Sequence, residues 1–215
     1  MRYGNTTWLQ TSVHITAFLP LALLIWDFTQ GQLTANPIRE IQLRTGKSAL
    51  VLLILSLACT PLFILSGLNQ ILSLRRTLGL YAFMYACLHF LNFIGLDYGF
   101  DFSLIREDIS EKRYALAGFA AFVILLPIAV TSRTAWKKRL GKNWKRLHRL
   151  TYAAALLVIL HFLWQTKADF RQPLIYSGIV IALLVVRMPW LRDLIYEHVA
   201  LMKRRQKDTS IADDI

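Results

Sequence analysis

The sequence predicts an all-α membrane protein, a polytopic bundle of six transmembrane helices with both termini in the cytoplasm. Of its 215 residues, 55% are hydrophobic and only 18% are charged. Six apolar stretches approach the length of about 20 residues with which a helix crosses a bilayer. Lys and Arg are concentrated in alternate connections between these stretches, which is the charge pattern of membrane proteins with a defined orientation.

Each apolar stretch is expected to be a helix. Only helices and closed barrels satisfy their backbone groups in lipid, and these stretches are too long and too continuously apolar for barrel strands. The first stretch has only Arg2 ahead of it and no small-residue cleavage pattern behind it, so we interpret it as a retained helix rather than a signal peptide. In order, the stretches cover residues 13–28, 48–68, 77–96, 114–132, 150–166 and 174–189.

The domain organisation is expected to be simple. Residues 1–202 form one transmembrane, cytochrome-like domain, and residues 203–215 form a short charged cytoplasmic tail. No internal repeat is evident in the sequence. Proline and glycine fall in the connections between the stretches, where they end helices.

The formal charge of +12 is explained by orientation rather than by nucleic acid, which we exclude as a partner. The connections on the side of the termini hold about 17 Lys and Arg, against about 8 on the other side, and the more basic side faces the cytoplasm. The largest contribution comes from residues 133–149. We interpret this segment as a topology signal and a contact for anionic membrane lipid, with a nucleotide or electron-donor site as the alternative. No glycine-rich phosphate loop follows a predicted strand, so the chain lacks dinucleotide-binding machinery.

The connection at residues 97–113 lies on the opposite, outer side and carries five carboxylates. It is interpreted either as a solvated loop or as a docking site for a periplasmic protein.

His89 and His161 are the strongest candidate functional residues. They lie about 12 and 11 residues from the inner ends of the third and fifth stretches, which places both roughly 17 to 18 Å into the membrane. An ionisable residue at such depth is a functional hypothesis by default. Two imidazoles at one level on facing helices suit a haem iron with both axial positions filled, an arrangement for electron transfer rather than oxygen chemistry. A polar contact between helices is the alternative.

The haem is expected to be of the b type, held without covalent bonds. Covalent attachment requires a Cys-x-x-Cys-His motif, whereas the only cysteine close to a histidine here is Cys87, in Cys87-Leu88-His89.

His148 is a candidate ligand of a second, inner haem. It lies about 13 residues before His161, roughly 20 Å along the helix axis. The third stretch carries Arg75 and Arg76 at the corresponding level, and these cannot ligate iron, so His14 is the only other histidine available at that depth. The competing interpretation of His148 is an interfacial histidine in a basic connection, and the haem count of one or two stays open.

A different class of function is a small transporter or assembly factor whose intramembrane histidines relay protons. Transporters often contain interrupted helices near the midplane, and Pro61 and Pro127 interrupt the second and fourth stretches. A self-contained ferric reductase would need a fused flavin and nicotinamide domain, which the chain does not contain.

Six short motifs, each weak alone, are specific in their order and spacing, and with them the chain resembles the MsrQ family (formerly YedZ). This family comprises the haem-binding membrane subunits of the bacterial periplasmic methionine sulfoxide reductase system, within the ferric-reductase-like transmembrane superfamily. The motifs are NPIREI at 36–41, TGK at 45–47, RRTLGLYAFMYACLH at 75–89, GKNWKRLH at 141–148, HFLW at 161–164 and PLIY at 173–176.

The resemblance implies a multi-pass protein of the bacterial inner membrane. Such a protein takes electrons from the quinone pool or a cytoplasmic flavin reductase and passes them to a periplasmic molybdopterin-containing methionine sulfoxide reductase, which supports repair of oxidised periplasmic proteins. It is then an electron-transfer subunit and not the catalytic subunit. His89, His148 and His161 match the family's haem-linked histidines. The family is also described as binding FMN, for which the sequence indicates no residues.

Overall fold

The computed structural model describes residues 4–188, with side chains from residue 8 onward. All regular elements in this part are helical, which confirms the predicted all-α class. The predicted tail at 203–215 and the end of the sixth apolar stretch lie outside the described residues. The elements are α1 (Gly4–Thr29), α2 (Pro37–Ser66), α3 (Asn69–Leu91), the π-helical turn η1 (Asn92–Asp97), α4 (Phe102–Glu111), α5 (Arg113–Val130), α6 (Thr134–Leu140), α7 (Lys142–Gln165) and α8 (Arg171–Val185).

Five of the described helices are long and apolar enough to cross a membrane, namely α1, α2, α3 with η1, α5 and α7. They coincide with the first five predicted stretches. α8 coincides with the sixth but has 15 residues, short of the length of about 20 that spans a bilayer. The sixth span and the side on which the termini lie therefore stay predictions.

Helix α2 begins well before its apolar stretch, because its first residues are good helix starters. The side chain of Asn36 accepts a hydrogen bond from a backbone N–H of the first turn at 3.0 Å, and Pro37 occupies the first helical position. Both residue types favour a helix N-terminus. This polar extension carries Gln42 and Gly46, which belong to the site described below.

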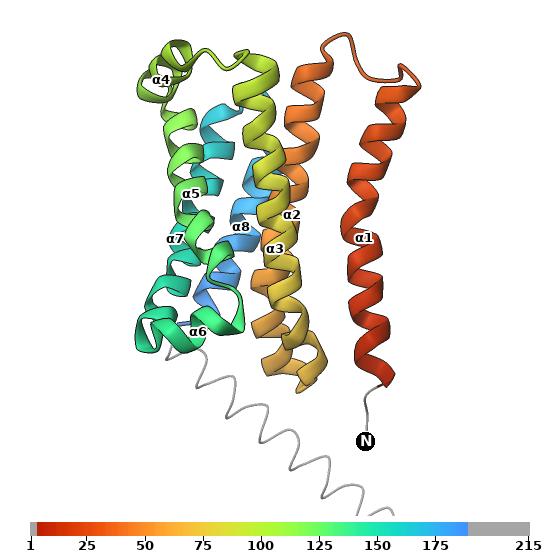
Figure 1. Ribbon diagram of the computed structural model, residues 1–215, viewed down its shortest axis with the longest axis vertical. Coiled ribbons are helices and arrows are strands. Elements are labelled where there is room, and N and C mark those ends of the chain that lie inside the picture. Colours follow the sequence, from red (N-terminus) through yellow and green to blue (C-terminus); the bar gives the residue numbers. More distant parts are fainter. Residues whose placement is uncertain (1–3, 189–215) are drawn as a thin grey trace, which may run out of the picture.

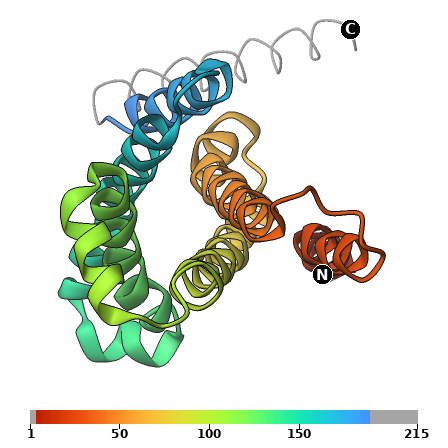
Figure 2. The ribbon, with the colours of Figure 1, turned by 90° about the horizontal axis from the view of Figure 1, so that it is seen from above.

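The helices form two close pairs, α2 with α3 and α5 with α7 (Figures 1 and 2). α8 packs on α7 and α2, and α1 lies on the outer side of the α2–α3 pair. Seen from above, α2, α3, α5, α7 and α8 form an open arc (Figure 2). The functional site lies where the two pairs face each other.

Helix α1 is held to the bundle by a tyrosine hydroxyl that inserts between a backbone N–H and a backbone carbonyl of this helix. The Tyr85 hydroxyl donates to the carbonyl oxygen of Ala17 at 2.7 Å and accepts from the N–H of Leu21 at 3.0 Å. In an undisturbed helix that N–H and that carbonyl would bond each other. Tyr85 is 1% exposed, so this anchor is fully desolvated.

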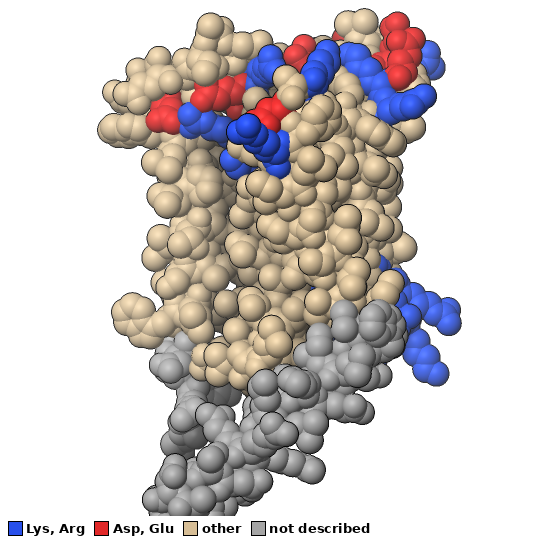
Figure 3. Space-filling view, turned by 180° about the vertical axis from the view of Figure 1, so that it is seen from behind, with Lys and Arg blue, Asp and Glu red and all other residues tan. Residues whose placement is uncertain are grey.

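Charge divides the two ends of the molecule, which we call the α4 end and the α6 end. Among the described residues every Asp and Glu lies at the α4 end, and an apolar band separates the two ends (Figure 3). The α6 end carries Lys and Arg, and no carboxylate occurs between residues 112 and 168. This distribution matches a protein that spans a bilayer, with the α4 end on one side and the basic α6 end on the other.

Candidate haem site

His89 of α3 and His161 of α7 lie side by side where the two helix pairs face each other. Their ring centroids are 5.9 Å apart and the ring planes are nearly perpendicular, at 88°. The depth calculated from the sequence therefore corresponds to direct proximity in space.

Both imidazoles are fixed by a backbone carbonyl of the partner helix in their own pair. Nδ1 of His89 donates to the oxygen of Gln42 in α2 at 2.9 Å, and Nδ1 of His161 donates to the oxygen of Tyr114 in α5 at 2.7 Å. A carbonyl oxygen can only accept, so each Nδ1 carries the proton. Each Nε2 then carries a lone pair instead of a proton, the form in which histidine binds a metal.

Two glycines allow the rings to approach these carbonyls. A Cβ atom at Gly46 would lie 2.9 Å from Nδ1 of His89, and one at Gly118 would lie 2.7 Å from Nδ1 of His161. Side-chain carbons do not approach other atoms this closely without displacing them. The lack of a side chain at Gly46 and Gly118 therefore allows the two imidazoles to take these positions.

The two halves of the site repeat each other along the chain. Both histidine–carbonyl bonds join residues 47 positions apart. Gln42, Gly46 and His89 each lie 72 positions before Tyr114, Gly118 and His161, respectively. The sequence contains no evident repeat, and this correspondence between the two halves comes from the contacts of the site. The shared spacing of a glycine and a histidine was the only signal, and it is too sparse to be seen without the contacts.

The histidines line a cavity of about 620 Å³ between the helix pairs, a volume typical of cofactor sites. Its walls near the rings are small residues or aromatic rings, including Phe90 and Phe122, whose centroids are 4.6 Å apart. Arg39 and Lys47 line its part toward the α4 end. The small residues lining the cavity are Gly46, Ala49, Ala82, Ala86, Ala115, Gly118 and Ala121.

Asp108 and Tyr98 also line the cavity, next to helix α4. Asp108 is buried and forms an ion pair with Lys112. Burial, together with the neighbouring Asp108 carboxylate, raises the pKa of Tyr98 to about 12, so this phenol is neutral at physiological pH. The hydrogen bond to Asp108 raises the pKa of Lys112, which keeps that ammonium group charged.

His148 lies apart from this pair, near the α6 end of α7. Its Nε2 lies 3.2 Å from the Thr131 hydroxyl, and its ring stacks on Trp144 with centroids 4.0 Å apart. The residue 72 positions before His148 is Arg76, so the repeat places arginine where a second histidine of an inner pair would stand. Arg75 lies within electrostatic range of His148.

His14 does not meet His148. Its Nδ1 lies 2.7 Å from the Tyr81 hydroxyl, at the contact of α1 with α3, on the side of that pair away from α5 and α7 (Figure 2).

The donor set of the cavity fits a haem better than a bare metal ion. Metal–imidazole bonds are about 2.0–2.1 Å long, so two imidazoles whose ring centroids are 5.9 Å apart could both reach one metal ion. No group of three or more His, Cys, Asp or Glu within residues 4–188 is arranged to hold a metal ion. A haem supplies four nitrogen ligands itself and needs only the two imidazoles from the protein.

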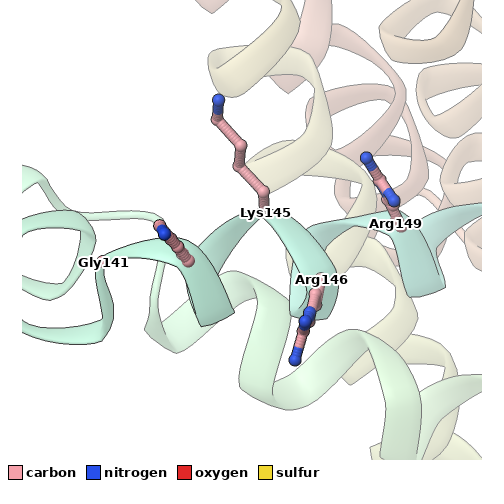
Figure 4. Close-up of a pocket in the computed structure, with 5 residues that line it drawn as sticks. Gly141, Lys145, Arg146 and Arg149 are labelled. Carbon is pink, nitrogen blue, oxygen red and sulfur yellow. The ribbon is translucent and has the colours of Figure 1, made fainter.

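The basic segment at the α6 end forms a separate, shallow groove at the start of α7, with a volume of about 520 Å³. Lys145, Arg146 and Arg149 extend from this helix in Figure 4, and Lys142 and Gly141 complete the lining. The described part of the chain offers these cations no carboxylate partner, since its ion pairs are all at the α4 end.

Comparison with known proteins gives the chain close relatives. The protein-methionine-sulfoxide reductase heme-binding subunit MsrQ of Xanthomonas axonopodis pv. citri (strain 306) is 45% identical over 181 residues, which are 81% of this chain and 83% of the relative. The protein of the same name from Herminiimonas arsenicoxydans is 45% identical over 187 residues, 86% of each chain. This chain belongs to the MsrQ family.

A broader family model agrees with this membership. Residues 45–159 match the ferric reductase like transmembrane component, a range that contains His89 and His148. No solved structure matches the chain. The site geometry of this MsrQ family member therefore comes from its own structure.

Proposed function

We propose that this protein is a b-type haem protein that carries electrons across the membrane for a methionine sulfoxide reductase. The observation that carries the proposal is the His89–His161 pair, with both Nδ1 atoms bonded to backbone carbonyls, so that neither Nε2 carries a proton. A haem bound there supplies one-electron redox chemistry. If both imidazoles held the iron, it would keep no open position for oxygen, which favours electron transfer over oxygen chemistry.

The protein's own residues orient the group and keep water from it. The two glycines seat the imidazoles, and the small residues of the cavity leave room for a macrocycle. The stacked rings of Phe90 and Phe122 form an apolar wall. Arg39 and Lys47 would hold the carboxylates of the haem, because guanidinium and ammonium groups form charge-assisted hydrogen bonds with carboxylates.

The proposed direction runs from the α6 end to the α4 end. We assign the basic α6 end to the cytoplasm, with α8 as the sixth span, in the bacterial inner membrane. The donor is the quinone pool or a cytoplasmic flavin reductase, and the acceptor is a periplasmic molybdopterin methionine sulfoxide reductase. The names of the relatives, which denote heme-binding subunits of a protein-methionine-sulfoxide reductase, support the proposal that the chain serves such a reductase. The chain is then an electron-transfer subunit. FMN binding rests on the family likeness alone.

His148 is proposed as a ligand of a second, inner haem that shortens the path from the cytoplasm. His148→Ala should leave the spectrum of the outer haem intact and slow its reduction from the α6 side by roughly tenfold or more, since outer and inner positions are about 20 Å apart. Haem content and stopped-flow reduction in vesicles measure both effects. Unchanged haem content together with an unchanged rate would contradict any role of His148.

The basic groove at the start of α7 is proposed to bind anionic lipid at the cytoplasmic surface. Each cation near such a surface contributes about 1 kcal/mol, so the double variant Lys145→Gln/Arg149→Gln should co-purify with several-fold less acidic phospholipid. Native mass spectrometry of the detergent-solubilised protein measures the bound lipid. Arg113→Gln, at the other end of the molecule, is the control. Equal lipid retention in all three proteins would refute the proposal.

A reduced-minus-oxidised visible spectrum of the purified protein, together with its haem-to-polypeptide ratio, tests the function itself. We expect the sharp bands of a b-type cytochrome and one or two haems per chain. Absence of these bands after haem-replete expression would overturn the proposal and favour a proton-relaying transporter.

A further inference from the structure

Gln42 contacts His89 through both its backbone and its side chain. Its carbonyl oxygen accepts from Nδ1, and its side-chain Nε2 lies 3.3 Å from Nε2 of the same imidazole. Because Nδ1 carries the proton, the amide must donate to the lone pair of the ring Nε2. That lone pair is the one that an iron atom would take.

Asn92 fixes the Gln42 amide from behind. It is 4% exposed and lies in the π-helical turn η1, directly after α3. Its Nδ2 donates to Oε1 of Gln42 at 2.5 Å and to the oxygen of Ile38 at 3.2 Å. Its own Oδ1 is buried and has no hydrogen-bond partner in the described part of the chain. A buried acceptor without a partner is unusual and unfavourable in a native protein.

We propose that Gln42 is a positioning residue that holds the His89 lone pair until iron takes it, and that its amide then transfers to the unpaired Oδ1 of Asn92. The inference rests on the proposed haem function. The exchange conserves hydrogen bonds: the Gln42 N–H that leaves His89 would bond Asn92 Oδ1, which is buried and has no other partner among the described residues. Gln42 and Asn92 already share one amide–amide bond, and the transfer would complete the second bond of a paired amide dimer.

The other half of the site lacks this device. The residues that correspond to Gln42 and Asn92 in the repeat are Tyr114 and Trp164, and within residues 8–188 Nε2 of His161 has no hydrogen-bond partner. His161 is therefore the free ligand and His89 the guarded one. The asymmetry predicts that iron binds His161 first and that release of His89 from Gln42 completes the site.

The test measures association of ferric haem with full-length protein that has been expressed without haem. Gln42→Leu removes the guard, so haem should associate roughly threefold faster or more, in line with the modest net strength of one hydrogen bond. Asn92→Leu removes the acceptor to which the amide transfers, so haem should dissociate several-fold faster into an excess of a haem-scavenging apoprotein. Gln10→Leu makes the same change at an exposed position of α1 that does not line the cavity, and it is the matched control, with unchanged rates.

General damage to the site would slow association in the Gln42 variant, so faster association separates guarding from a merely structural role. NMR of the haem-free wild-type protein with ¹⁵N-labelled histidine gives a readout without mutation. We expect the Nε2 signal of His89 to show a hydrogen-bonded acceptor and that of His161 a free one. Equivalent signals, or slower or unchanged association in Gln42→Leu with a normal haem spectrum, would overturn this inference alone. Lack of a haem spectrum in the wild-type protein would overturn the proposed function instead.

Discussion

In a His148→Ala background, which leaves only the outer haem site, replacement of His89 or His161 by alanine is expected to remove the low-spin haem spectrum of the purified protein. Each substitution deletes one of only two protein ligands and leaves a hole beside the cavity. Since loss of even a supporting group around a metal ligand lowers affinity about 10- to 100-fold, loss of the ligand itself should reduce haem content below about a tenth of the wild-type value. Absorbance of the reduced protein, normalised to polypeptide, measures the effect.

His14→Ala is the control for this prediction. His14 also lies in a membrane-spanning helix, but it bonds Tyr81 at the α1–α3 contact and does not line the cavity. Its variant should keep the full spectrum. Retention of the low-spin bands in both the His89 and the His161 variants would refute the assignment of this pair.

Gly118→Ala is expected to have the second largest effect. The new methyl carbon would lie 2.7 Å from Nδ1 of His161, so the imidazole must move away from the Tyr114 carbonyl and from the position in which it can ligate. We expect haem affinity to fall at least about tenfold, equivalent to about 1.4 kcal/mol. Haem titration of the apoprotein measures the change.

Gly178→Ala provides a matched control in helix α8, because a Cβ atom there meets nothing within 4 Å. It should bind haem like the wild-type protein, and alanine at this helical position should not weaken the fold. An equal loss of affinity in the two variants would point to general helix effects. Wild-type haem affinity in Gly118→Ala would show that the close approach of the His161 ring to residue 118 does not matter for haem binding.

The helices and the level of the two histidines were predictable because they depend on simple periodic geometry. Apolar stretches mark where a chain can lie in lipid, and a rise of about 1.5 Å per residue converts sequence position into depth. His89 and His161 could therefore be paired without a structure. Their contact depends on α3 and α7 being neighbours in the bundle, which the depth of each histidine does not determine.

The supporting residues could not be predicted in the same way. Gln42 and Gly46 lie before the apolar stretch at 48–68, in a polar part of α2 that hydropathy assigns to a connection. They enter the site because Asn36 and Pro37 start the helix early. Gly118 lies in an apolar stretch in which glycine and alanine look alike, and only the distance to His161 separates them.

The histidines near the α6 end show that depth in the membrane does not determine which residues meet. Depth alone made His148 and His14 possible partners, yet α1 lies behind the α2–α3 pair and holds His14 against Tyr81. The structural repeat instead pairs the position of His148 with Arg76. Any inner haem at His148 therefore has a protein environment unlike that of the outer pair.

The most direct test of the central claim is pulsed electron–nuclear double resonance on the oxidised protein with ¹⁵N-labelled histidine. Recording it in the His148→Ala variant leaves only the outer site to contribute. The account predicts two directly coordinated histidine nitrogens on one low-spin iron, and loss of this low-spin signal when His89 or His161 is also replaced. A low-spin iron with one coordinated histidine nitrogen, or none, in the His148→Ala protein would contradict it.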